Sequence, residues 1–165
     1  RQRNQKNIQR NVAYVGTQQA AFVRYEQRFY SKHIMHQLDY SEFYITNVCN
    51  LSCSGCNRFN NYTFRGRQRW ADLEPVYREW SKSVSIRHCA VLGGEPLLNP
   101  DVIDWCRGIL ELWPDTYLRL ITNGYRIEHR QDLYNLNIEY KDRFSVWVGI
   151  HNENHVPDVV SRVHQ

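Results

Sequence analysis

The stretch IRHCAVLGGEPLLNPDVIDWCRGILELWPDTYLRLI, residues 86–121, decides the fold, because it has the pattern of a strand, a helix and a second strand. Residues 86–92 are mostly apolar and predict a strand that ends at a Gly-Gly pair. Residues 117–121 predict a further strand, which ends at an Asn-Gly turn signal. Strands joined through a helix are expected to lie parallel, with a right-handed crossover.

The helix between these strands has clear start and stop signals. Asn99 can cap its first turn, and Pro100 suits the first helical position. Asp101 favours the positive end of the helix dipole. We expect the helix to run to about Trp113, where Pro114 ends it.

Similar patterns continue on both sides of this unit. Apolar side chains at helical spacing or in short β-branched and aromatic runs predict three further helices and two further strands. The helices are expected at residues 18–37, 72–83 and 129–136, and the strands at 42–48 and 144–150. A chain of 165 residues in which strands and helices alternate predicts an α/β fold with a parallel sheet.

The unusual motifs of the chain all follow predicted strands. The cysteine loop comes after the first strand, Gly-Gly-Glu-Pro after the second, Thr-Asn-Gly after the third, and His151 after the fourth. Ligands of parallel sheets bind beyond the carboxyl ends of the strands. We therefore expect these motifs to meet at one edge of the sheet, where His151 is either a ligand or an ordinary surface histidine.

Three of the five cysteines stand in one loop, Cys49-Asn-Leu-Ser-Cys53-Ser-Gly-Cys56. An odd, clustered set does not resemble a disulfide framework and suits a reducing compartment, so we predict a cytoplasmic protein. Three thiolates can hold an iron–sulfur cluster and leave one iron open for chemistry. The alternatives are incidental thiols or a zinc site that Cys89, Cys106 or a histidine completes. Otherwise Cys89 and Cys106 are most simply buried apolar side chains.

The ordered set of motifs resembles the radical S-adenosylmethionine (radical SAM) superfamily. The resemblance rests on Cys-x3-Cys-x2-Cys, then Gly93-Gly94-Glu95-Pro96, then Thr122-Asn123-Gly124, and covers roughly residues 42–151. It implies a partial parallel (β/α) barrel. The family core usually has six strands and this chain predicts four, so we expect the chain to be incomplete at its C-terminus.

The resemblance also implies the roles of the cysteines and of the Gly-Gly-Glu motif. Cys49, Cys53 and Cys56 would bind a 4Fe–4S cluster, whose free iron would bind the amino and carboxylate groups of S-adenosylmethionine. Gly93, Gly94 and Glu95 match the motif that contacts the amino group of the cofactor. Backbone carbonyls and a carboxylate are suitable acceptors for an ammonium group.

The resemblance leaves the roles of three further residues undecided. Thr122 and Asn123 either contact the ribose or methionine portion of the cofactor or simply form a turn. Gly55 stands where the family often has an aromatic residue near the adenine, so only a backbone contact to the adenine edge is expected there.

The implied activity is the reductive cleavage of S-adenosylmethionine to a 5′-deoxyadenosyl radical, which abstracts hydrogen from an unidentified substrate. A flavodoxin or ferredoxin is the expected electron donor. One alternative is an activating enzyme that installs a glycyl radical on a partner protein. Another is a zinc-stabilised nucleic-acid-binding module, suggested by the basic N-terminus and the Arg-rich, aromatic stretch 58–70. We favour instead that this stretch shields the cluster with its aromatic side chains while its arginines face water.

We expect two parts in the chain: a basic arm and helix at residues 1–40, and a partial radical SAM core at 41–165. The first ten residues carry four positive charges and no acid, and the chain does not begin with Met, so we expect its true start to be missing. The first residues have no apolar run behind them, so we expect no secretory signal among them. No apolar run is long enough to predict a membrane span.

Overall fold

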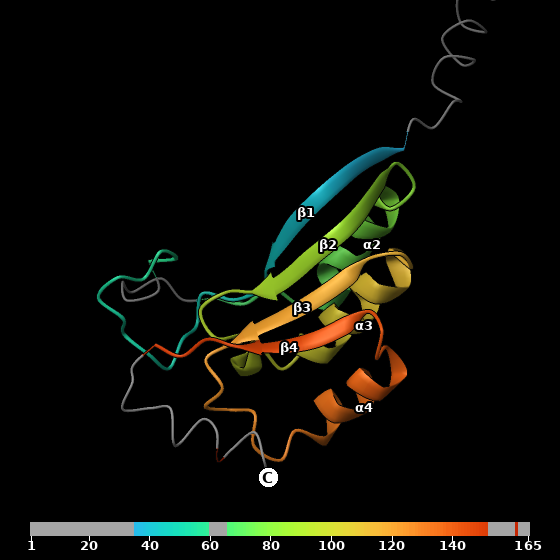
Figure 1. Cartoon of the computed structure of the whole chain (residues 1–165). Helices are drawn as coiled ribbons and strands as arrows, with labels where there is room; N and C mark the ends of the chain where they lie inside the picture. Colours follow the sequence, from blue (N-terminus) through green and yellow to red (C-terminus); the bar gives the residue numbers. More distant parts are fainter. Residues whose placement is uncertain (1–34, 60–65, 152–160, 162–165) are drawn as a thin grey trace, which may run out of the picture. The chain divides into compact units, whose positions relative to one another are not determined.

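The computed structural model describes residues 35–59, 66–151 and 161 (Figure 1). Strands and helices alternate through this part of the chain, as the sequence predicts. The elements are β1 (His36–Tyr44), α2 (Trp70–Trp80), β2 (Val84–Leu92), η1 (Pro96–Leu98), α3 (Val102–Leu112), β3 (Tyr117–Thr122), α4 (Gln131–Glu139) and β4 (Phe144–Val148). None of the described helices is long and apolar enough to cross a membrane.

The four described strands form one sheet in the order β1-β2-β3-β4, and every neighbouring pair is parallel. The arrowheads of the strands therefore point toward the same edge (Figure 1). This arrangement confirms the predicted α/β fold and agrees with a partial (β/α) barrel.

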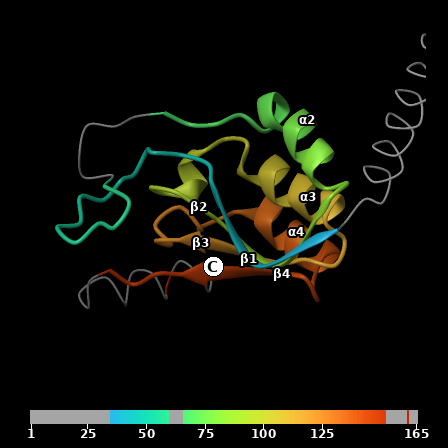
Figure 2. The ribbon, with the colours of Figure 1, turned by 90° about the horizontal axis from the view of Figure 1, so that it is seen from above.

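Helices α2, α3 and α4 cover one face of the sheet (Figure 2). Alternate side chains of β3 are buried, among them Leu118 and Leu120, and they pack with Phe144 of β4 in the core. Helix α3 adds Trp105 and Ile109, which lie four residues apart on its buried face. The opposite face of the sheet carries no described helix.

Strand β1 begins earlier and ends earlier than the predicted strand 42–48. Residues 36 and 37 lie in β1 and not in the predicted helix 18–37, because they pair with β2 and the N–H of His36 bonds to Ser83 O. The rest of that helix, and almost all of the basic arm, lie outside the described residues. Backbone pairing continues past Tyr44, since Ile45 N bonds to Leu92 O and Gly94 N to Thr46 O.

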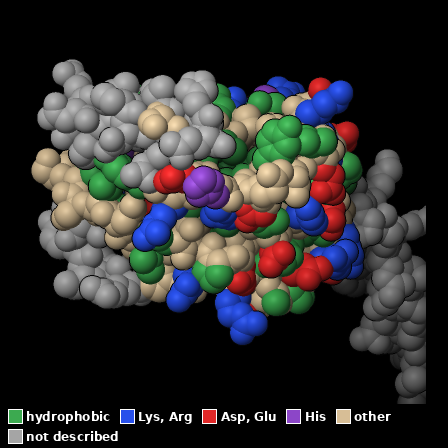
Figure 3. Space-filling model, turned by 90° about the horizontal axis from the view of Figure 1, so that it is seen from below, with side chains coloured by type: hydrophobic (Ala, Val, Ile, Leu, Met, Phe, Trp, Pro, Cys, Tyr) green, Lys and Arg blue, Asp and Glu red, His purple; other side chains and the backbone are tan. Residues whose placement is uncertain are grey.

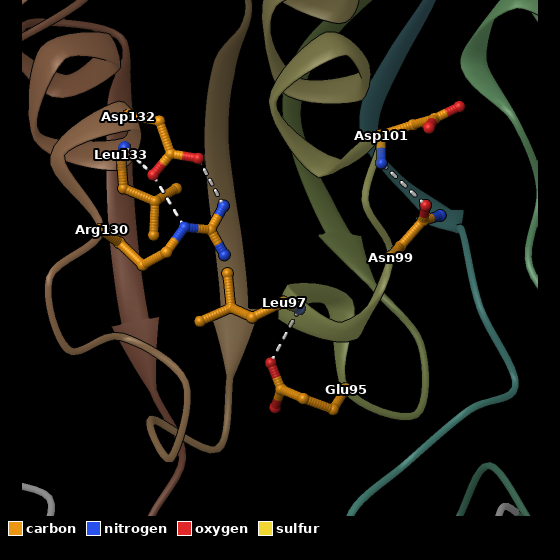
Figure 4. A network of polar contacts seen from close by, with 7 residues as sticks. All are labelled: Glu95, Leu97, Asn99, Asp101, Arg130, Asp132 and Leu133. Atoms are coloured by element: carbon orange, nitrogen blue, oxygen red, sulfur yellow. Dashed lines mark hydrogen bonds and ion pairs between the residues drawn. The ribbon is translucent and has the colours of Figure 1, made fainter.

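Helix α3 begins at Val102, later than predicted, with Asp101 at its N-cap position. Asn99 still makes the hydrogen bond expected of a cap, because its Oδ1 accepts from the backbone N–H of Asp101 at 3.0 Å, in the turn before the helix (Figure 4). The amide nitrogen of Asn99 also donates to two distant carbonyl oxygens, those of Ile45 and Gln68, at 3.0 Å each. The carboxylate of Asp101 accepts from the N–H of Trp70, at the start of α2. These two side chains therefore join segments that are distant in sequence.

The remaining predicted elements are present with shifted ends. Helix α2 starts and ends earlier than 72–83, and a turn follows it. Helix α4 starts and ends later than 129–136. Strands β2 and β3 match their predictions closely, and β4 ends two residues before the predicted end at 150.

Candidate functional site

The three clustered cysteines follow the extended segment after β1. Cys49, Cys53 and Cys56 form no disulfide and are half-buried, and all three line one pocket. Two contacts shape their loop: Leu51 N donates to Cys49 Sγ at 3.4 Å, and Cys56 N donates to Cys53 O at 3.3 Å. Burial raises the pKa of the Cys49 thiol above its ordinary value.

The pocket suits a group larger than one metal ion. Its volume is about 140 Å³, several times the roughly 30 Å³ that a water molecule occupies in the liquid. Within residues 35–59, 66–151 and 161, no three His, Cys, Asp or Glu side chains are arranged to hold a single ion. In a cubane each thiolate binds a different iron, so its sulfurs stand further apart than the ligands of one ion. Three thiols around an open pocket fit such a cluster.

Gly93 and Gly94 lie where the end of β2 approaches the backbone before the cysteines. A Cβ on Gly93 would lie 2.4 Å from Thr46 O, and a Cβ on Gly94 would lie 2.4 Å from Val48 O. Both glycines also line the pocket. Their lack of a side chain therefore allows the pairing of these segments and leaves their backbone facing the pocket.

Glu95 is fully buried, with none of its surface exposed. Its carboxylate accepts hydrogen bonds from Leu97 N at 2.9 Å and Asn123 N at 2.7 Å. The hydroxyl of Thr122 donates a third, at 2.6 Å. Figure 4 shows the bond to Leu97 at the start of η1. Glu95 thus joins the end of β2 to the end of β3, and its predicted contact with the cofactor ammonium stays a prediction.

Thr122 and Asn123 occupy different places in the site. Thr122 is buried and bonds to Glu95, whereas Asn123 lines the pocket. The amide of Asn123 donates to Asn50 Oδ1 at 2.8 Å. Gly124 has a φ of 82°, as the predicted Asn-Gly turn requires. The two residues therefore form the turn, and Asn123 also reaches the cysteine loop.

Gly55 and His151 also line the pocket. Gly55 is exposed and has no atom within 4 Å of a Cβ built on it. His151 follows β4 and is exposed. The structure thus brings together motifs that follow all four strands, as predicted, and Thr122 and Glu95 stand behind the pocket wall.

The Arg-rich, aromatic stretch 58–70 is only partly described, and its described ends agree with the prediction in part, because Arg67 and Arg69 are exposed. Arg58 does not simply face water, because it forms an ion pair with Glu42 and lies over the ring of Tyr44. Trp70 packs edge-on against Trp105 of α3 and does not cover the pocket. These partners lie on other elements and could not be predicted from the stretch itself.

Charges of both signs are interspersed on the face seen from below in Figure 3. Positive side chains elsewhere in the described part of the chain also pair with acids: Arg107 bonds to Glu139, and Arg130 to Asp132. Figure 4 shows the second pair. A nucleic-acid partner stays an untested alternative.

Cys89 and Cys106 lie in the core and do not line the pocket, which confirms that they are buried small side chains. Burial raises the pKa of Cys89 to about 11 and raises that of Cys106 further. The structure therefore gives no support to a zinc site that either of them completes.

The sequence alone does not single out two polar residues of the pocket region, Asn50 and Asn57, and does not predict the ion pair of Arg58. Asn50 directly follows Cys49, and Asn57 directly follows Cys56. This position beside a cysteine is the only feature of the sequence that could indicate a place in the site. Arg58 was noticed for its charge, but its pairing with Glu42 joins residues 16 apart in sequence.

Comparisons with known proteins agree with this geometry. The family described as the Radical SAM superfamily matches residues 43–164. The chain is 32% identical over 93 residues to the GTP 3′,8-cyclase of Pseudomonas fluorescens, covering 55% of this chain and 28% of that protein. It is 31% identical over 110 residues to the GTP 3′,8-cyclase of a Nostoc species, covering 63% of this chain and 33% of that protein. The chain thus spans about a third or less of these relatives.

Proposed function

We propose, since this chain belongs to the Radical SAM superfamily, that it binds a 4Fe–4S cluster and cleaves S-adenosylmethionine reductively. The observation that carries the proposal is a shared pocket. Cys49, Cys53 and Cys56 line it together with Gly93 and Gly94. When bound and reduced, the cluster supplies the electron that releases a 5′-deoxyadenosyl radical from the cofactor.

The residues of the chain would bind and orient the two groups. The three thiolates would hold three irons, and the glycine backbone would accept hydrogen bonds from the cofactor ammonium. The close approach of Gly94 to Val48 keeps the glycine backbone beside the first cysteine. Glu95 holds Asn123 at the pocket wall through the backbone N–H of that residue. Alignment of this kind makes a reaction between bound groups efficient.

The substrate is a finer part of the proposal. The relatives are named GTP 3′,8-cyclase, which makes a nucleoside triphosphate the first substrate to test. We propose a reduced flavodoxin or ferredoxin as the electron donor. A cytoplasmic location is proposed because none of the five cysteines forms a disulfide, which suits a reducing compartment.

Anaerobic reconstitution with iron and sulfide tests the proposal. We expect about four iron and four sulfide per chain, and 5′-deoxyadenosine after reduction with dithionite in the presence of S-adenosylmethionine. Cys53→Ala should lose both the cluster and the product. Ser54→Ala is the matched control, because Ser54 is exposed in the same loop. Binding of zinc without any cluster, or equal product from wild type and Cys53→Ala, would reject the function.

A further inference from the structure

The face of the sheet opposite the helices carries a group of aromatic and positively charged side chains. Arg119 of β3 lies over the rings of Trp147 and Tyr117, with its guanidinium carbon 4.4 Å and 5.8 Å from the two ring centroids. Leu118 and Leu120, its neighbours in β3, are buried in the core under the helices. Because successive side chains of a strand point to opposite faces, Arg119 lies on the helix-free face.

Arg119 has no anionic partner in the described part of the chain. None of the ion pairs found among those residues includes it, and its Nε is buried without a hydrogen-bond acceptor. The two ring contacts are cation–π interactions of the guanidinium charge, and they give its N–H groups no hydrogen-bond acceptor. A buried donor without a partner is unfavourable, so this site is incomplete without an acceptor.

The acidic side chain nearest in register does not fill this role. Glu42, Ala90 and Arg119 align across β1, β2 and β3, so they share one face. One carboxylate oxygen of Glu42 accepts from Tyr40, and the other forms the ion pair with Arg58. The charge of Glu42 is therefore balanced, and among the described residues no acid compensates the positive charge of Arg119.

A second unsatisfied group lies on the same face. The ring of His88 lies edge-on to Tyr117, at 6.3 Å between centroids, and its Nδ1 is buried without a partner. His88 pairs in register with Tyr117. Two neighbouring strands thus direct unsatisfied nitrogen atoms to one region.

A chain of contacts leads from this face toward the cysteine-lined pocket. Arg58 lines the pocket and lies over Tyr44, while its partner Glu42 lies in register with Arg119. A molecule on the helix-free face could therefore extend from Arg119 toward the cysteine loop.

We propose that Arg119 binds the negatively charged group of the substrate, a phosphate or a carboxylate, on the helix-free face of the sheet. The inference rests on the proposed function, because the cofactor pocket at the sheet edge is where the substrate must react. Trp147 and Tyr117 hold the guanidinium and reduce its contact with water, which strengthens its attraction for an anion. Arg119 is thus a binding residue that selects anionic substrates.

Titration of the reconstituted protein with inorganic phosphate and with succinate tests the proposal, since the two probes distinguish a phosphate from a carboxylate. The reporter is the fluorescence of Trp147, which is about half exposed and touches Arg119. At least one anion should change the emission saturably, and Trp147→Phe should remove the change. Arg119→Gln should weaken the binding about ten- to a hundredfold, and Arg119→Lys should weaken it less.

Arg78→Gln is the matched control, because Arg78 is an exposed arginine of α2, on the other side of the sheet. It should bind the anion as the wild type does. The proposal is overturned if neither anion binds saturably, which is the result expected when a carboxylate of the protein itself pairs with the guanidinium of Arg119. It is also overturned if Arg119→Gln binds the anion as tightly as the wild type. Formation of 5′-deoxyadenosine by the wild type is measured separately. Product without anion binding rejects this inference alone, and anion binding without product rejects the proposed function.

Discussion

The side-chain amide of Asn123 donates a hydrogen bond to Oδ1 of Asn50, at 2.8 Å, although the two residues lie 73 positions apart. Asn50 directly follows Cys49. The backbone N–H of Asn123 donates to Glu95 at 2.7 Å. The pair therefore ties the cysteine loop to the ends of β2 and β3, and it holds the first cysteine in position.

Replacement of Asn123 by Ala should loosen the cysteine loop. The change removes one hydrogen bond, worth about 0.5–1.5 kcal/mol, and leaves Asn50 without this partner. We expect faster release of cluster iron to a chelator, with little change in the far-ultraviolet circular dichroism. Asn50→Ala should have a similar effect, and the double variant should release iron no faster than the faster single variant.

Asn135→Ala is the control for this pair, because Asn135 is exposed on α4 and bonds only to Gln131 among the described residues. It should release iron at the wild-type rate. If Asn123→Ala also releases iron at that rate, the bond does not stabilise the loop.

Glu95→Gln should lower the stability of the protein itself as well as cofactor binding. Both carboxylate oxygens of Glu95 accept hydrogen bonds, from Leu97 N and Thr122 on one and Asn123 N on the other. In the glutamine variant, the amide NH₂ replaces one of these oxygens and therefore faces a backbone N–H donor in either orientation. We expect a loss of about 1–3 kcal/mol in the free energy of unfolding, measured with denaturant on the protein without its cluster. Unchanged stability would show that these contacts contribute little.

A carboxylate can accept about four hydrogen bonds, so three donors leave room for one more. The cofactor ammonium could occupy it, and then Glu95→Gln should also weaken binding of S-adenosylmethionine in the reconstituted protein. Equal affinity in variant and wild type would leave Glu95 with only its role in joining β2 to β3.

Gly94→Ala should prevent cluster assembly. The added Cβ would lie 2.4 Å from Val48 O and 3.0 Å from the Cβ of Cys49, so the backbone must move. Overpacking of this kind costs roughly 1–3 kcal/mol. Gly55→Ala is the matched control in the same pocket, since nothing lies within 4 Å of its Cβ. Iron analysis should find a cluster in the second variant and little in the first; equal iron in both would contradict the argument.

The best sequence predictions concern segments with a strong hydrophobic pattern. Strand β3 was placed within one residue because its buried and half-buried side chains alternate, which is the signature of a strand covered on one face. The meeting of the motifs at one edge followed from parallel topology alone. Neither inference needed knowledge of a distant contact.

The failures concern contacts that sequence does not reveal. The first five residues of β1 are all exposed, so backbone pairing with β2 forms that part of the strand without a hydrophobic pattern. Asn99 accepts from the N–H of Asp101 as a cap residue does, but its bonds to the distant carbonyls of Ile45 and Gln68 could not be predicted from the sequence. Arg119 was visible as a charged residue within a strand, yet its lack of a partner appears only once the neighbouring strands are in place.

The buried thiol of Cys89 should make stability depend on alkaline pH. Burial raises its pKa from 9.0 to about 11 in the folded protein, whereas in the unfolded chain it ionises near the ordinary value. Because the folded pKa is the higher one, the stabilisation is complete below pH 9 and is lost as the pH rises toward 11. Between these two pKa values, each pH unit lowers the free energy of unfolding by about 1.4 kcal/mol.

Cys89→Ala isolates this effect, because every other titrating group is common to both proteins. The variant should be less stable than the wild type at pH 8, owing to the lost packing of a core side chain. The difference in the free energy of unfolding should shrink by about 1 kcal/mol between pH 9 and pH 10, measured by denaturant titration under reducing conditions. Cys53→Ala, at a half-buried position in the loop, is the comparison. A difference between wild type and Cys89→Ala that stays constant over this range would show that the folded protein tolerates the Cys89 thiolate, and that burial does not hold the thiol protonated.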